Sequence, residues 1–403
     1  MTSRVSHDHH YVPEWYQRRF LANGATELHR IALKPRYIEM SIEHSYYEKD
    51  YLRRSPSRLF CIEDLYLLRF GPQETDALEK WFFGPVDRFG CKAVEFFANF
   101  NGPAKGIQEA SRNLLRYMGA QRFRTPRGLD WLGGQSKRER RAVLFLLTHL
   151  FRAHETMWTE GIWEIVCADN CLTKFIVSDS PVTFYNTHMP PGLTPYPGTE
   201  EWDKAATRTV FPLGLDRCLI ITHVQFVRNP HIKADVARSN ARSFAPALAN
   251  FNQIQFGRQL EDIEVKKVNF ILKRAATRYI AAGKKEWLYP EQGNRTFGWA
   301  KLDDDWFLLP DPWRVGFRSK ILWGTQDGRS WSMDAYGRDP LHPDYDDREQ
   351  HDREWISQQN MKYEWALKRR GKARGRTGEF KDGVADKLID KFLASYDPRG
   401  SKR

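Results

Sequence analysis

Apolar residues recur at the spacing of an amphipathic helix in several parts of the first half of the chain. This pattern predicts a helix pair over 75–100, with a break at Gly84-Pro85 because proline lacks a backbone amide. Further helices are predicted over 111–123 and over 137–160. The apolar face of the last helix is predicted to contain Ala142, Phe145, Leu146, His149, Leu150 and Ala153.

Short runs of alternating or continuous apolar residues predict strands in the same part of the chain. The charged segment 25–40 predicts an edge hairpin. Other strands are predicted over 163–168, 174–177, 209–212 and 218–224, and helices over 232–249 and 261–282. Together these elements predict an α+β fold in which a mixed sheet is packed by several helices.

The pattern changes after residue 283. Eight of the fourteen tryptophans lie within 287–365, in short segments separated by turn dipeptides. We therefore expect an α+β domain over 1–283 and a small tryptophan-rich β appendage over 284–336. An acidic linker and a basic, partly helical C-terminal tail are predicted over 337–403.

The chain is basic, with 63 lysines and arginines against 51 acidic residues and a net charge of +12. Such a field favours encounter with polyanions, so we expect nucleic acid or a nucleotide as partner. The segment 368–376 has six basic residues in nine, broken by Gly371 and Gly375, which predicts a mobile tether for phosphates. A solvated tail that only aids solubility fits the same composition.

Composition also bears on the cellular setting. No apolar run approaches the roughly 18–20 residues that cross a bilayer, so we expect no membrane span. The first residues lack the apolar core of a signal peptide. Five cysteines among 403 residues are few and odd in number, which predicts free buried thiols in a cytoplasmic protein.

The densest group of potential metal ligands is the run His7, Asp8, His9 and His10. Imidazole and carboxylate groups bind zinc, manganese or iron, and imidazole is the general base suited to neutral pH. In an extended chain His9 and His10 point to opposite faces, so at most one faces a given site. A histidine-rich terminus without function is the alternative, but the apolar residues of the following YVPEWYQRRF can anchor the segment.

A second candidate group follows the apolar strand sequence FIV, where Ser178 and Asp179 come directly after the strand. A carboxylate at the end of a buried strand suits a metal ligand or a general base, and Pro181 prevents the strand from continuing. The alternative is an Asx-turn in which Asp179 caps the backbone of its own loop.

The sequence QRFRTPR, with Gln121 and Arg124, ends the helix predicted over 111–123. Guanidinium groups at this position suit either a phosphate clamp or a pair with a buried carboxylate. The pair Arg18-Arg19 is open to the same two interpretations.

Several familiar motifs are absent. The chain has no GxxxxGK[ST] phosphate loop, no GxGxxG after a strand, no HExxH and no GxSxG. Cys167 and Cys171 lack a second cysteine pair that would complete a zinc site. These absences argue against the common nucleotide-hydrolase and lipase classes.

Taken together, the motifs resemble those of one bacterial family. HHYVPEWYQRRF, which begins at His9, resembles the HHYVPxxYxRxF signature of the family called domain of unknown function 4238. Four further stretches resemble motifs of that family in the same order, beginning at Gln121, Phe175, Val210 and Asn269. The resemblance covers about residues 7–283. Two departures are Ser180, where the family has an amide, and Gly214-Leu215, where it has Ser-Pro.

The resemblance implies a shared fold and pocket but no known activity. We expect its polar signature residues to converge in a site suited to chemistry at a phosphate. The function predicted first is a nucleic-acid- or nucleotide-directed enzyme, a metal-dependent nuclease or phosphodiesterase in bacterial defence. His9, His10 and Asp179 are the predicted catalytic residues and ligands of a divalent metal, and Arg19, Gln121, Arg124, Ser178 and Tyr16 are predicted to bind phosphate or substrate.

Two other functions fit the same residues. One is a transferase that binds a dinucleotide such as NAD, since only the Rossmann mode of binding requires the missing glycine motif. The other is a non-catalytic binding module, in which the signature residues form a buried polar network that fixes the fold.

Overall fold

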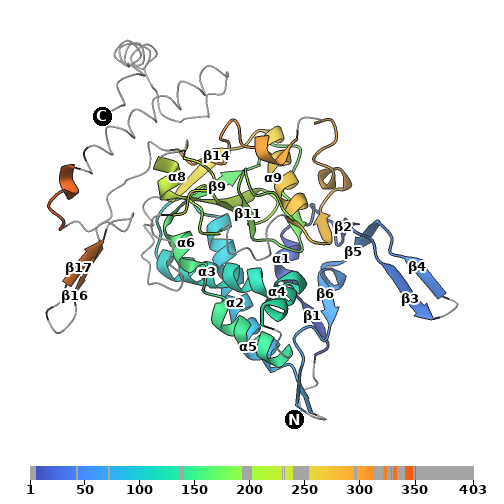
Figure 1. Ribbon diagram of the computed structural model, residues 1–403. Coiled ribbons are helices and arrows are strands. Elements are labelled where there is room, and N and C mark those ends of the chain that lie inside the picture. Colours follow the sequence, from blue (N-terminus) through green and yellow to red (C-terminus); the bar gives the residue numbers. More distant parts are fainter. Residues whose placement is uncertain are drawn as a thin grey trace. The chain divides into compact units, whose positions relative to one another are not determined.

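The computed structural model describes most of the first 311 residues and short pieces of the remainder (Figure 1). The described residues are 6–41, 44–70, 73–136, 140–192, 202–228, 230, 232–238, 254–294, 297–311, 321–324, 328, 330–333, 341–347 and 350. The chain divides into two compact units, which are Met1–Ser319 with Ala335–Gly337, and Lys320–Asp334 with Arg338–Arg403. The predicted basic segment 368–376 and most of the predicted helix 232–249 lie outside the described residues.

The first unit is built on a five-stranded sheet in the order β11-β12-β13-β9-β14. Its strands are β9 (Gly161–Cys167), β11 (Thr183–Tyr185), β12 (Arg208–Pro212), β13 (Arg217–His223) and β14 (Gln255–Gln259). Neighbours are antiparallel except β14, which runs parallel to β9. Strands β12 and β13 are buried on both faces, which explains their continuous apolar runs. The strands predicted over 163–168, 209–212 and 218–224 are confirmed.

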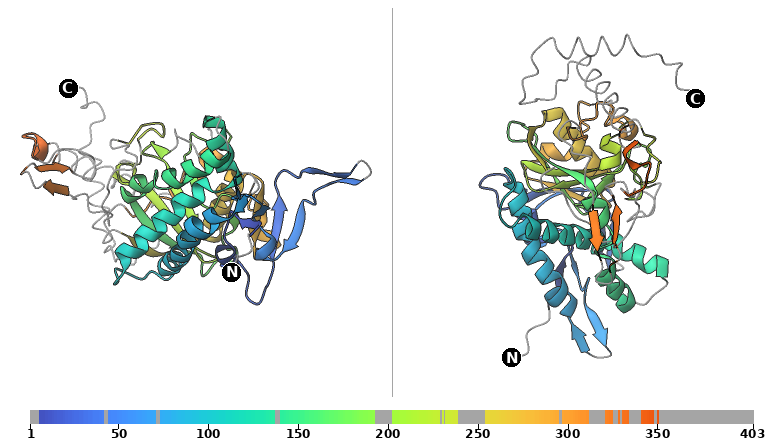
Figure 2. Two further views of the ribbon diagram at one scale, coloured as in Figure 1. Left: turned by 90° about the horizontal axis from the view of Figure 1, so that it is seen from below. Right: turned by 90° about the vertical axis from the view of Figure 1, so that its left-hand side faces the viewer.

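A layer of helices covers one face of this sheet (Figure 2). It consists of the π-helix η2 (Leu78–Phe83) and helices α2 (Gly84–Ala98), α3 (Ile107–Phe123), α4 (Pro126–Ser136), α5 (Arg140–Leu150) and α6 (Glu155–Thr159). Phe97 of α2 packs edge-on against Trp163 of β9, with ring centroids 5.4 Å apart. The mixed sheet and its helices confirm the predicted α+β fold.

The predicted break at Gly84-Pro85 is a change of helix type rather than a gap. The π-helix η2 leads directly into α2, and the change of helix type lies next to Pro85, which has no N–H to donate to the preceding turn. Farther along, α2 approaches α3 closely at Gly90. A Cβ atom there would lie 2.7 Å from the ring of Tyr117, so only glycine allows this packing.

The predicted helix over 137–160 is instead two helices, α5 and α6, separated by a turn. Its predicted apolar face is right in part, because Leu146, Leu150 and Ala153 are partly buried against the core. The side of α5 that is buried carries Val143, Leu144 and Leu147, whereas Phe145 is 67% exposed. The predicted residues and the buried residues both recur at helical spacing. The spacing alone therefore could not show which of the two sets packs on α3 and α4.

The other face of the five-stranded sheet is covered by α9 (Asp262–Ala275) and by the segment 297–311. Charged pairs join these parts. Asp303 pairs with Arg208 of β12. Arg258 of β14, which donates two hydrogen bonds to Glu164 of β9, also donates to the carbonyl of Phe307 at 2.9 Å. Lys267 of α9 pairs with Asp305 at 2.8 Å.

Part of the tryptophan-rich stretch therefore belongs to the first unit. Trp287 and Trp299 are buried in its core, near the short helices η4 (Lys285–Leu288) and η5 (Trp299–Lys301). The predicted β character is confirmed in the second unit, where β16 (Ile321–Gly324) and β17 (Ser330–Met333) form an antiparallel hairpin. Independent folding of the three predicted parts stays a prediction.

A second sheet of the first unit has the order β10-β15-β2-β5. Its strands are β2 (Leu28–Ala32), β5 (Tyr51–Arg54), β10 (Val177–Ser178) and β15 (Tyr279–Ala282). The prediction of an edge hairpin over 25–40 is wrong for β2, which lies inside this sheet between β15 and β5. The prediction of helix to residue 282 is wrong after Ala275, because the chain there enters strand β15.

The remaining elements are short. They are β1 (Asp8–His10), α1 (Glu14–Arg18), β3 (Tyr37–Ser41), β4 (His44–Tyr47), η1 (Pro56–Arg58), β6 (Cys61–Glu63), β7 (Leu68–Phe70), β8 (Gln73–Thr75) and α8 (Val224–Arg228). Strand β1 pairs with β6, β3 with β4, and β7 with β8. Among the described residues, no helix is both long and apolar enough to cross a membrane.

One carboxylate ties the second sheet together. Glu48 accepts hydrogen bonds from Arg30 at 2.9 Å, Arg278 at 2.7 Å and the Tyr279 hydroxyl at 2.7 Å. The two guanidinium groups also lie over the Tyr279 ring, 4.5 and 4.6 Å from its centroid. Burial opposes ionisation of Glu48, but these hydrogen bonds outweigh it and lower the pKa of Glu48 to about 2.

The Glu48→Gln variant tests this arrangement. A folded-state pKa of about 2 against 4.5 in the unfolded chain means that the carboxylate stabilises the fold above pH 4.5, and that this stabilisation is lost as the pH falls toward 2. We expect the variant to unfold more easily at pH 7, by on the order of 2 kcal/mol, and to show a flatter decline of stability below pH 4.5. Urea titrations at several pH values measure this, and parallel pH profiles would contradict it.

Two alanine variants test the burial of α5. Leu147→Ala should lower the free energy of unfolding by about 2–5 kcal/mol, because it leaves a cavity in the core. Phe145→Ala should change it by less than about 0.5 kcal/mol, because the ring is 67% exposed. Chemical denaturation followed by circular dichroism gives both values. Equal losses in the two variants would show that α5 is turned differently.

Candidate functional site

His9 is fully buried in strand β1 and is bonded on both sides of its ring. Its Nδ1 accepts the backbone N–H of Tyr66 at 2.9 Å, and its Nε2 lies 3.1 Å from the carbonyl oxygen of Ser6. Because Nδ1 must accept and a carbonyl can only accept, the proton lies on Nε2 of a neutral ring. Burial lowers the pKa of His9, which agrees with the neutral form.

From His9 a chain of hydrogen bonds runs through the signature residues. The hydroxyl of Tyr66 donates to the carbonyl of Arg124 at 2.6 Å, and Nε of Arg124 donates to Oε1 of Gln121 at 2.8 Å. Nε2 of Gln121 donates to the carbonyl of Tyr11 at 2.7 Å, only two residues from His9. The structure therefore brings His9, Gln121 and Arg124 together, in one buried network.

Arg124 is the charged centre of this network. Its side chain is 1% exposed and Nη1 donates to both oxygens of Asp87 of α2, at 2.9 and 3.0 Å. Although burial acts in the opposite direction, Asp87 raises the pKa of Arg124 and keeps it charged. The guanidinium also lies over the rings of Phe83 and Tyr117. This is the pairing with a buried carboxylate that the sequence left open as an alternative to a phosphate clamp.

Tyr16 and Arg19 contact another motif, the end of strand β12. The Tyr16 hydroxyl donates to the carbonyl of Pro212, and Nε of Arg19 donates to the carbonyl of Leu213. The Tyr16 ring stacks on Phe211, with centroids 5.5 Å apart. Both predicted substrate-binding side chains are thus used to attach the N-terminal segment to the main sheet.

Asp179 is buried and accepts three backbone N–H groups, from Thr277 at 2.9 Å, Arg278 at 2.6 Å and Tyr279 at 2.9 Å. Burial raises the pKa of Asp179, and these three bonds act against the rise. The carboxylate caps the start of β15, a distant segment, rather than its own loop. Ser178 lies in β10 and its hydroxyl accepts the N–H of Ser180 at 3.2 Å.

The three predicted metal ligands have separate partners. The half-buried His10 has its Nε2 3.2 Å from the carbonyl of Ser57, whereas His9 and Asp179 are bonded as described above. Within the described part of the chain, no group of three or more His, Cys, Asp or Glu side chains is placed to hold a metal ion. The geometry therefore gives no support to a metal centre made by His9, His10 and Asp179.

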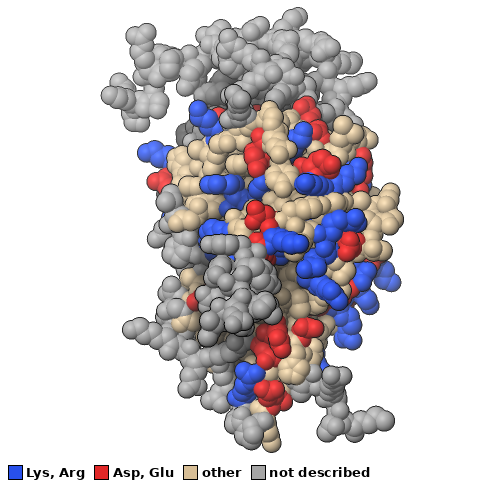
Figure 3. Space-filling view, turned by 90° about the vertical axis from the view of Figure 1, so that its right-hand side faces the viewer, with Lys and Arg blue, Asp and Glu red and all other residues tan. Residues whose placement is uncertain are grey.

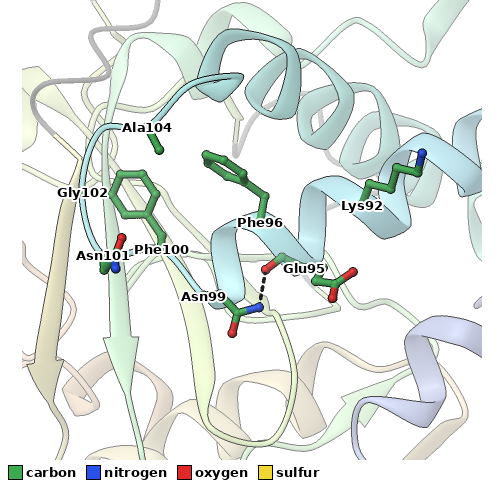
Figure 4. A pocket seen from close by; sticks show the side chains of 8 residues that line it. All are labelled: Lys92, Glu95, Phe96, Asn99, Phe100, Asn101, Gly102 and Ala104. Carbon is green, nitrogen blue, oxygen red and sulfur yellow. Dashed lines mark hydrogen bonds between the residues drawn. The ribbon is translucent and has the colours of Figure 1, made fainter.

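Sequence reasoning missed a surface hollow of about 350 Å³ at the end of α2 (Figure 4). Its lining comes from the last turns of α2 and the loop to α3: Lys92, Glu95, Phe96, Asn99, Phe100, Asn101, Gly102 and Ala104. Two adjacent aromatics, Phe96 and Phe97, were the available signal. A helix cannot direct both rings into the core, so one had to line the surface.

The hollow has an aromatic wall and a polar rim. Rings of Phe96 and Phe100 lie 6.1 Å apart, and Phe100 packs edge-on against Phe256 of β14 at 5.4 Å. The side-chain amide of Asn99 donates to the carbonyl of Glu95 at 3.0 Å, and Lys92 is exposed at the edge. Such a hollow can accept a flat ring, and Lys92 and Glu95 contribute opposite charges to its lining.

No family model, curated protein or solved structure matches the chain. Membership of the family called domain of unknown function 4238 stays a prediction, which is based on the sequence motifs alone.

Asp179→Asn tests whether this carboxylate is structural. An amide keeps one acceptor oxygen but turns a donor NH2 toward backbone N–H groups, so the free energy of unfolding should fall by about 1–3 kcal/mol. Asp130→Asn, at an exposed position of α4, is the matched control and should leave stability unchanged. Both values come from chemical denaturation. A stable Asp179→Asn protein would contradict a capping role for the carboxylate.

Proposed function

We propose that this protein is a nucleic-acid-binding module whose signature residues maintain the fold. The observation that carries this proposal is the inward bonding of the polar signature residues. Side chains of His9, Gln121, Arg124 and Asp179 are buried and bonded to other parts of the protein. These bonds account for the motif without a ligand, and the net charge of +12 of the whole chain is the feature that supports a polyanionic partner.

The charge of the chain supports a polyanionic partner. The whole sequence carries a net charge of +12, and half of that excess lies in residues 351–403. On the face shown in Figure 3, Lys and Arg side chains gather toward the middle and right of the view, with Asp and Glu between and below them. Around β2, β5 and η4 the exposed basic residues are Lys34, Arg36, Lys49, Arg53, Arg54, Lys284 and Lys285. They outnumber the exposed acidic residues of the same segments, Asp50 and Glu286. An excess of cations favours contact with phosphate backbones with little sequence preference.

The other interpretations stay predictions. A metal-dependent nuclease in bacterial defence requires His9, His10 and Asp179 to act together, and an NAD transferase requires a dinucleotide pocket; the contacts of the described residues favour neither. All five cysteines are free thiols, which supports the proposal of a cytoplasmic protein.

Salt dependence tests the proposed function. Fluorescence anisotropy with a labelled oligonucleotide should give an affinity that falls linearly, on logarithmic axes, as salt rises from about 50 to 200 mM. An uncharged oligonucleotide analogue, such as a peptide nucleic acid of the same sequence, is the control and should bind weakly at every salt concentration. Absence of binding at low salt would overturn the proposal. Metal-dependent cleavage lost in folded His10→Ala protein would favour the nuclease instead.

A further inference from the structure

The outer face of η2 and α2, with the loop that follows, carries four aromatic side chains, two of them exposed and two packed partly against the core. Trp81 of η2 is 81% exposed and Phe89 of α2 is 39% exposed. Phe96 and Phe100, in the hollow, are half-buried. Exposed rings of this size cost free energy in a soluble domain, and their alignment along one helix face marks an interaction surface.

Basic side chains alternate with these rings. Arg88 and Lys92 are exposed on the same face, and the guanidinium of Arg88 lies 4.8 Å from the centroid of Phe89. Glu95 is the exposed acidic residue of α2, while Asp87 is turned inward to Arg124. We call the row Trp81, Arg88, Phe89, Lys92, Phe96 and Phe100 the aromatic–basic stripe.

We propose that the aromatic–basic stripe binds single-stranded nucleic acid, with bases stacked on its rings and a base in the hollow. This inference rests on the proposed function and assigns it the face of η2 and α2, in addition to the basic residues around β2, β5 and η4. Rings interleaved with cations are the combination by which proteins hold single strands, because every base has a face to stack and every nucleotide has a phosphate. A duplex hides its base faces and could use only the cations.

The dimensions of the stripe agree with this occupant. At the rise of an α-helix, the 15 residues of α2 extend over roughly 21 Å, which is long enough for several nucleotides. The hollow of about 350 Å³ is lined by Phe96 and Phe100, by Asn99 and by the oppositely charged Lys92 and Glu95. A base can therefore stack at this end of the stripe, and the phosphates are left to the exposed Arg88 and Lys92.

The test compares Trp81→Ala with Phe145→Ala, in the full chain. Both remove an exposed aromatic ring from a helix of the first unit, but only Trp81 belongs to the stripe. The probes are a labelled oligothymidylate and a duplex of equal length, measured by anisotropy. Stacking on one ring is worth about 1–3 kcal/mol, so Trp81→Ala should weaken single-strand binding by about 5- to 150-fold. Phe145→Ala should bind like the wild type, and duplex affinity should change little in either variant.

Each other outcome has a definite meaning. If the wild type binds neither probe, the proposed function fails. If it binds both and Trp81→Ala equals Phe145→Ala, the stripe is not the site, although the proposed function stands. Binding of wild-type protein to vesicles of anionic phospholipid, lost in Trp81→Ala while oligothymidylate binding persists, would assign the stripe to a membrane surface and overturn the inference.

Discussion

The structure depends on the solvation of one buried guanidinium group. Arg124 is almost wholly removed from water, and a charge in that position requires permanent partners. Asp87 supplies the opposite charge from α2, and Gln121 supplies an acceptor from α3. Removing one member of such a pair typically costs about 3–5 kcal/mol, so these helices cannot move apart without a large loss of stability.

The same constraint explains the N-terminal motif. Gln121 is oriented by its hydrogen bond from Arg124, and its own NH2 group donates to the carbonyl of Tyr11. Tyr66 links Arg124 to His9, because its hydroxyl donates to the carbonyl of Arg124 and its backbone N–H donates to the His9 ring. A histidine is suited to this place because its neutral ring offers one donor and one acceptor at fixed positions. Polar residues that the sequence predicted to be catalytic or ligand-binding thus attach an N-terminal strand to the layer of helices.

Much of the fold follows from local patterns, because helices α2 and α3 have apolar residues at helical spacing and strands β9, β12 and β13 contain short apolar runs. What the patterns could not supply is the choice between two apolar rows on α5, where Leu147 is buried and Phe145 is not. Local patterns also could not place β2 inside a sheet. One of its neighbours, β5, is nearby in the sequence, but the other, β15, is distant, and tertiary packing decides how the three strands are paired.

The candidate site was harder to predict for a physical reason. Residue type is the same for a ligand-binding histidine and a structural one, and the difference lies in which atoms fill its two hydrogen-bonding positions. His9 accepts a hydrogen bond from the backbone N–H of Tyr66, and Asp179 accepts one from the backbone N–H of Thr277. Both donors are far from their acceptors in the sequence. The aromatic–basic stripe was overlooked because its rings share the helix with core residues such as Phe97.

The protonation state of His9 tests the central claim most directly. Nitrogen-15 NMR of the imidazole, assigned by comparison with His9→Asn, distinguishes the neutral Nε2–H form from the charged ring. A structural His9 should remain neutral with its proton on Nε2 at pH values below 6.5, because burial lowers its pKa. A ring that becomes charged near pH 6.5, or that carries its proton on Nδ1, would show that His9 is accessible and free to act on a ligand.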